Sequence, residues 1–164
     1  MCADERHRGL DDGDRKGQHP KDHLARFRGW MHADGYAGYD KLYTDANGTA
    51  GAITEIACWA HARRGLYDVF IATKAPLAEE ALKRIAEFYA VEADIRGVSP
   101  GQRLSARRAR TAPLVAAFGG WLQAQRRKIS ARSRLGEKLA YIHNHWDGLQ
   151  TFLTDGRVEI DSNR

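Results

Sequence analysis

The feature that most constrains the fold is a run of apolar residues at helical spacing near the C-terminal end. It comprises Leu135, Leu139, Ile142, Trp146, Leu149 and Phe152 or Leu153. Steps of three and four place these side chains on one face of a helix. An apolar face of this length has to be buried against other helices. The spacing therefore predicts one helix over 135–153, packed within a helical block.

Two further helical segments precede this helix. The first begins at Pro76, which suits a first helical turn, and Gly97 is a plausible end. The second follows a Ser-Pro break, and Pro113 inside it is expected to kink the helix or to restart it. We therefore expect residues 76–154 to be helical and the chain to be mostly helical.

Strand signals lie only in the first part of the chain. Short apolar segments at Trp30–Ala33 and Ile53–Cys58 predict two strands, and Asp34 directly follows the first. A carboxylate at the tip of a core strand is a common way for α/β folds to present a metal-binding acid. Asp-Gly is also an ordinary turn signal, so this spacing alone leaves both readings open. The predicted fold class is α/β, mostly helical.

Charge and cysteine content narrow the class of protein. Lys and Arg number 26 against 21 Asp and Glu, which gives a net charge of +5 and suits a polyanionic partner. Cys2 and Cys58 form no CxxC pair, which fits a reducing compartment. The sequence has no apolar run of membrane-spanning length and its N-terminus is charged, so we expect a cytoplasmic protein without membrane partners.

Basic residues on the predicted helices are the candidate contacts to DNA. Arg63 and Arg64 fall in the first turns of a helix, where positive charge opposes the helix dipole. A phosphate partner would explain them, and a solvated basic pair is the alternative. The same two readings stay open for the later arginines. The predicted DNA contacts are His61, Arg63, Arg64, Arg107, Arg108, Arg126 and Arg127.

Four motifs occur in a fixed order along the chain. They are Asp-Gly-Tyr-Ala-Gly-Tyr at 34–39, Cys-Trp-Ala-His-Ala-Arg-Arg at 58–64, Trp-Asp-Gly-Leu at 146–149 with Asp-Gly-Arg at 155–157, and Glu-Ile-Asp-Ser-Asn at 159–163. Together they resemble the catalytic domain of transposases of the insertion sequence 66 family. The resemblance covers Asp14 to Arg164. It implies a ribonuclease H-like core with two Asp and one Glu that bind divalent metal, and it implies DNA and other transposase subunits as partners.

The resemblance also implies which acid this chain supplies. Asp34 matches the second Asp of the family, a catalytic ligand of Mg²⁺ or Mn²⁺. The first Asp of the family lies upstream of the match at Arg15-Lys16-Gly17, and the Glu follows Asp-Ser-Asn by three residues, beyond Arg164. We therefore expect a fragment truncated at both ends, with one of three acids, which is inactive alone and does not bind the metal tightly.

The expected domain division follows from the same reading. Residues 1–17 form a charged arm without regular structure, and 18–75 form a partial ribonuclease H-like core. Residues 76–154 form a helical insertion in that core, and 155–164 begin the final catalytic segment. The alternative function is a non-catalytic basic helical module that binds DNA or a protein partner.

Overall fold

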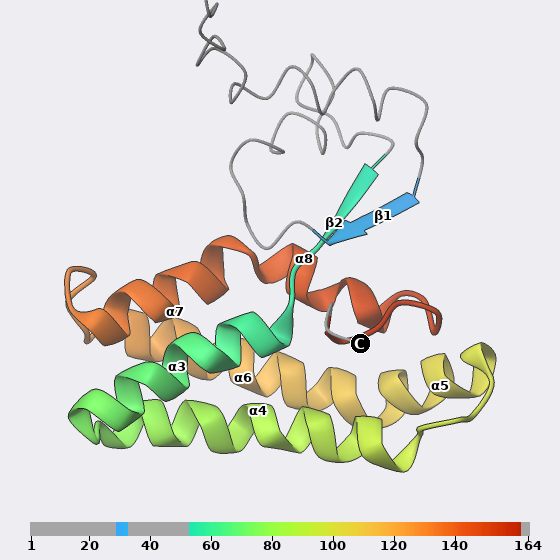
Figure 1. The fold of residues 1–164 in the computed structure, drawn as a ribbon, viewed down its shortest axis with the longest axis horizontal. Coiled ribbons are helices and arrows are strands. Elements are labelled where there is room, and N and C mark those ends of the chain that lie inside the picture. Colours follow the sequence, from blue (N-terminus) through green and yellow to red (C-terminus); the bar gives the residue numbers. More distant parts are fainter. Residues whose placement is uncertain (1–28, 33–52, 162–164) are drawn as a thin grey trace, which may run out of the picture. The chain divides into compact units, whose positions relative to one another are not determined.

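A computed structural model of the chain describes residues 29–32 and 53–161 (Figure 1). The expected arm at 1–17, the motif at 34–39 with Asp34, and the end of the last motif at 162–163 lie outside the described residues.

Two short strands form the described β structure. Strand β1 covers Gly29–His32, strand β2 covers Ile53–Ile56, and the two pair in a two-stranded sheet. Both lie where the short apolar segments predicted strands. The ribonuclease H-like core itself stays a prediction.

The described residues are otherwise mostly helical, as the apolar spacing predicted. The helices are α3 (Trp59–Thr73), α4 (Pro76–Asp94), α5 (Pro100–Ala106), the π-helical η2 (Arg107–Thr111), α6 (Ala112–Arg126), α7 (Arg134–Asn144), α8 (Trp146–Gln150) and the 3-10 helix η3 (Thr151–Leu153). Helices α3, α4, α6 and α7 run in alternating directions (Figure 1). Because α3 and α6 each contact both α4 and α7, the four form an antiparallel bundle.

The core of this bundle is centred on Trp59. Its side chain is fully buried, and its ring meets Phe88 edge-on at a centroid distance of 5.0 Å and Phe118 at 5.7 Å. A third edge-on contact joins it to Trp146 at 6.3 Å. Each aromatic pair of this kind contributes about 0.5–1.5 kcal/mol beyond the burial of its area. Trp59 therefore links α3 with α4, α6 and α8.

Two predicted helix signals coincide with a helix end and with an irregular turn. The chain leaves α4 after Asp94 and turns through Gly97, whose φ of +83° is a conformation that favours glycine. Before Pro113 the helix widens into η2, where the Ala112 N–H donates to the Arg107 carbonyl, and it continues without a gap as α6 from Ala112. Pro113 thus marks an irregular turn in a continuous helix, and the helix does not restart there.

The prediction of one uninterrupted helix over 135–153 is wrong. Helix α7 ends at Asn144, and α8 and η3 follow after His145. The carbonyls of Gly148 and Leu149 accept hydrogen bonds from Ala57 N and Trp59 Nε1, respectively. These hydrogen bonds tie α8 to Ala57 and to Trp59, the first residue of α3.

The predicted boundary at residue 75 falls in the short connection between α3 and α4. These two helices pack directly against each other. The structure thus gives the helical block a fourth long helix, α3, ahead of Pro76, while the division into core and insertion stays a prediction.

Within the described ranges, no helix is both long enough and apolar enough to span a bilayer.

Candidate functional site

Three of the four motif segments meet at the N-terminal end of α3. The Trp59 N–H donates to the Ile160 carbonyl at 3.3 Å, and the Trp59 indole donates to the Leu149 carbonyl at 2.8 Å. The side chain and the backbone of Trp59 thereby bind residues that lie about 90 and 100 positions further along the sequence. The fold brings the segments at 58–64, 146–149 and 159–161 to one place.

Asp161 caps helix α3 from a distant part of the chain. The residue before the helix, Cys58, provides no side-chain cap. Instead Asp161 Oδ1 accepts a hydrogen bond from the Ala60 N–H at 2.9 Å. A carboxylate at a helix N-terminus satisfies a free N–H and is favoured by the helix dipole. Asp161 therefore fixes the C-terminal segment on α3.

The same oxygen holds Tyr89 of α4. The Tyr89 hydroxyl donates to Asp161 Oδ1 at 2.6 Å. Burial, followed by this hydrogen bond and the negative charge of Asp161, raises the pKa of Tyr89 well above its usual value. The phenol therefore stays protonated and keeps donating throughout the physiological range.

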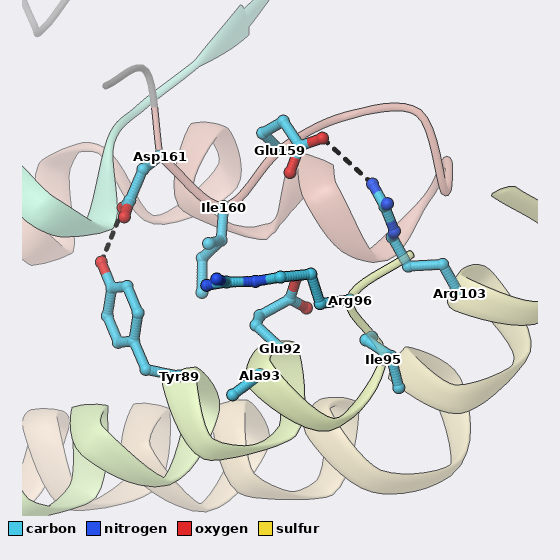
Figure 2. Close-up of a pocket in the computed structure, with 9 residues that line it drawn as sticks. All are labelled: Tyr89, Glu92, Ala93, Ile95, Arg96, Arg103, Glu159, Ile160 and Asp161. Carbon is cyan, nitrogen blue, oxygen red and sulfur yellow. Dashed lines mark hydrogen bonds and ion pairs between the residues drawn. The ribbon is translucent and has the colours of Figure 1, made fainter. Parts of the chain in front are cut away.

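A pocket of about 390 Å³ adjoins this contact (Figure 2). Its walls come from α4, from α5 and from the segment 159–161. Arg103 binds Glu159 at 3.0 Å, and Arg96 extends across the pocket. The three carboxylates at its wall all have protein partners: Glu92 binds Arg107, Glu159 binds Arg103 and Asp161 binds Tyr89. None of these acids faces the pocket as a free metal ligand.

Arg107 joins the C-terminal segment to α4 and is fully buried. Its Nε and Nη2 donate to the two carboxylate oxygens of Glu92 at 2.7 and 2.8 Å. Its Nη1 donates to the carbonyls of Phe152 at 2.9 Å and Val158 at 2.7 Å. All its strong donors are used inside the protein. The prediction that Arg107 contacts DNA is wrong, because its guanidinium is enclosed and neutralised.

A tight turn at 155–157 completes the segment. Arg157 donates to Asp155 from its side chain at 2.7 Å and from its backbone at 2.8 Å, which lowers the pKa of Asp155 to about 2. A Cβ on Gly156 would lie 1.8 Å from the Pro100 carbonyl oxygen. Glycine is therefore required for this turn to approach the start of α5.

The other predicted DNA contacts are accessible but lie in separate places. His61, Arg63 and Arg64 are exposed on the first turns of α3, with the His61 ring 5.3 Å from Tyr141 and Arg63 6.0 Å from the Tyr89 ring.

Arg108 is exposed on η2. Arg127 is exposed and Arg126 partly exposed at the end of α6. Figure 1 places η2 and the end of α6 at opposite ends of the bundle. The structure therefore does not gather all these cations on one surface.

No metal centre can be built from the described residues. Across residues 29–32 and 53–161, no three His, Cys, Asp or Glu side chains gather as a metal-binding group. Asp34, the predicted ligand, lies outside these ranges. The described residues therefore do not fit the divalent metal that the resemblance implies.

Sequence reasoning missed three residues that organise this region. They are Tyr89, Glu92 and Asp161, and the contacts that each makes were not predicted. Asp161 and its two partners are separated by 72 and 101 positions, so no local pattern signals the contact.

Comparisons with known proteins agree with the motifs. The family profile described as "Transposase IS66 family" matches residues 11–164. Three uncharacterized proteins of Sinorhizobium fredii (strain NBRC 101917 / NGR234) are similar to the chain. Over 162 residues, y4hP is 34% identical, which covers 92% of this chain and 29% of y4hP.

The protein y4jD is 38% identical over 141 residues, covering 85% of this chain and 28% of its own length. The third protein, y4qI, is 33% identical to the chain, and the matched region covers 26% of y4qI. The chain thus spans less than a third of the length of these relatives. No solved structure gives a significant match. Because the profile covers nearly the whole sequence, the chain belongs to the IS66 family of transposases.

Proposed function

We propose that this chain is part of the catalytic domain of a DNA transposase, in which the helical bundle holds the final catalytic segment in place. The observation that carries the proposal is the convergence of three family motifs at the start of α3. Asp161, Arg107 and Trp59 together hold the segment 158–161 against the bundle. Catalytic groups act only when they are held close to their productive geometry.

In this proposal Asp34 is a metal-binding acid of the whole enzyme. The basis is its match to the family motif, with an acid directly after a predicted strand. The other two acids have no match in this chain, and the proposal takes them from the length of the relatives that the chain does not span. Mg²⁺ or Mn²⁺ would supply charge neutralisation at the reacting phosphate in that complete enzyme. This chain's own part is to hold the final catalytic segment in position and to bind DNA.

The proposed DNA contacts near the motif segments are His61, Arg63, Arg64 and Arg108. All four are exposed, and none forms an ion pair with a described acid. Arg63 and Arg64 stand at the positive end of the α3 dipole, so their charge is not there for helix stability. A phosphate beside these turns would be stabilised by the arginines, since the N-terminus of α3 itself is already capped by Asp161.

A non-catalytic role stays open as the second candidate. The observation that favours it is the bundle itself, whose core is closed around Trp59 and whose described carboxylates all serve structure near the pocket. Such a module would bind DNA or another transposase subunit without cleaving it.

The test separates the two candidates by cleavage. The purified chain with Mg²⁺ or Mn²⁺ is expected neither to nick nor to join DNA that carries the ends of the element. A chimera in which this chain replaces the matched segment of y4hP is expected to cleave the same DNA if y4hP does. Cleavage by y4hP together with an inactive, folded chimera would favour the non-catalytic role. Cleavage by the chain alone would overturn the proposal.

A further inference from the structure

The connection between α6 and α7 concentrates positive charge. Within 126–134 there are five basic residues and no acid; they are Arg126, Arg127, Lys128, Arg132 and Arg134. We call these five residues the α6–α7 loop surface. The whole chain carries a net charge of only +5, so this short segment holds as much positive charge as the entire protein has in excess.

These cations are not neutralised within the described part of the chain. Arg126 is partly exposed and the other four are exposed, and none forms an ion pair with a described acid. The acids at the start of α4, which Figure 1 places at the same end of the bundle, are already engaged. Glu79 binds Lys83 and Glu80 binds Arg84, each at 2.8 Å.

Helix dipoles account for only part of the pattern. Arg126, Arg127 and Lys128 follow the C-terminal end of α6, where positive charge is favoured. Arg132 and Arg134 stand at the N-terminal end of α7, where positive charge is disfavoured. Glu137 in the first turn of α7 already answers part of that dipole, so the five cations, more than the helix end, favour an anion here.

The backbone of the loop is fixed by its own hydrogen bonds. The Ser130 carbonyl accepts from Ser133 N at 3.0 Å and from Ser133 Oγ at 2.7 Å, and Ser133 Oγ accepts from the Gly136 N–H at 3.0 Å. A Cβ on Gly136 would lie 2.0 Å from the Ser130 oxygen, so glycine allows the loop to fold back on α7. Because the backbone is already ordered, binding through this loop costs less conformational entropy.

We propose that the α6–α7 loop surface binds the phosphate backbone of duplex DNA without regard to base sequence. The inference rests on the proposed function and adds a second DNA contact, at the end of the bundle opposite Asp161.

The test compares two variants of equal net charge. The loop variant carries R127Q, K128Q, R132Q and R134Q, and leaves the partly buried Arg126 in place. The control variant removes four exposed cations that belong to neither set of proposed DNA contacts, with K83Q, R96Q, R110Q and R157Q. Binding of each to a short duplex of random sequence is measured by fluorescence anisotropy from about 50 to 200 mM salt, the range over which phosphate contacts change affinity most visibly.

If the four loop cations each contact a phosphate, they contribute about −3.5 to the slope of log affinity against log salt. The unaltered chain should therefore lose affinity on the order of 100-fold between the lowest and the highest salt through these four contacts. The loop variant is expected to lack this part of the salt dependence. The control variant is expected to keep the salt slope of the unaltered chain.

Equal losses in the two variants would overturn the inference, because net charge alone would explain binding. Unchanged binding by the loop variant would overturn it too. No binding by the unaltered chain would reject both sets of contacts.

Discussion

Replacing Arg107 with Met is expected to destabilise the helical unit more than most single changes. Met keeps much of the volume of the side chain but removes every donor. It leaves the Glu92 carboxylate, whose side chain is 13% exposed, without its bidentate partner. It also leaves the carbonyls of Phe152 and Val158 without the hydrogen bonds that Arg107 donates at 2.9 and 2.7 Å.

The size of the effect follows from these losses. Removing one partner of a buried ion pair costs about 3–5 kcal/mol, and each buried carbonyl left without a donor costs about 1 kcal/mol. Because these terms overlap, we expect a loss of about 4 kcal/mol in the free energy of unfolding. The double variant R107M/E92M removes the stranded carboxylate as well, so about 2 kcal/mol should remain for the two carbonyls.

The assay is urea unfolding followed by tryptophan fluorescence, which reports on the core around Trp59. The matched control is Arg108→Met, the neighbouring exposed arginine, which should change stability by less than about 0.5 kcal/mol. A cost for Arg107→Met no larger than that for Arg108→Met would refute the reasoning. So would a double variant that is no more stable than the single one, because the carboxylate would then not be the stranded group.

Three other predictions concern the same unit. Asp161→Ala should cost about 1–2 kcal/mol in urea unfolding because α3 loses its cap, and no change would remove Asp161 from that role. Because the pKa of Tyr89 is raised in the folded state, its neutral form contributes stability that is fully present below pH ~10 and is lost as pH rises above that value. Tyr89→Phe should therefore flatten the alkaline fall in the free energy of unfolding, measured from pH 8 to 11. An unaltered fall would contradict the assignment. Gly136→Ala should destabilise strongly because of its contact with the Ser130 carbonyl, while Gly101→Ala, with no atom within 4 Å, should not, and equal thermal unfolding midpoints would contradict the close approach.

The sequence was sufficient for the parts of the fold that depend on local periodicity. The apolar spacing predicted helices, Gly97 predicted the end of α4, and Pro113 predicted an irregularity where η2 precedes α6. The interruption at His145 was not predictable in this way, because the apolar stripe continues through it. The hydrogen bonds that tie α8 to the start of α3 join residues about 90 positions apart, so no local pattern signals them either.

The site was less predictable because its main contacts are between distant charged residues. Arg107 looked like one more cation of a basic helix. One signal was present: steps of four back from buried Val115 fall on Thr111 and then on Arg107, which therefore continue the buried face. Asp161 gave no such signal, since its partners Ala60 and Tyr89 lie on two different helices.

The most direct test of the functional account uses the role of Asp34. In the y4hP chimera, the two variants to compare are Asp34→Asn and Asp68→Asn, the second being an exposed acid on α3 without a described ion pair. Cleavage of DNA with the ends of the element is measured with Mg²⁺ and with Mn²⁺. The account predicts that Asp34→Asn abolishes cleavage while Asp68→Asn retains it. Metal-dependent cleavage that survives Asp34→Asn would contradict the account.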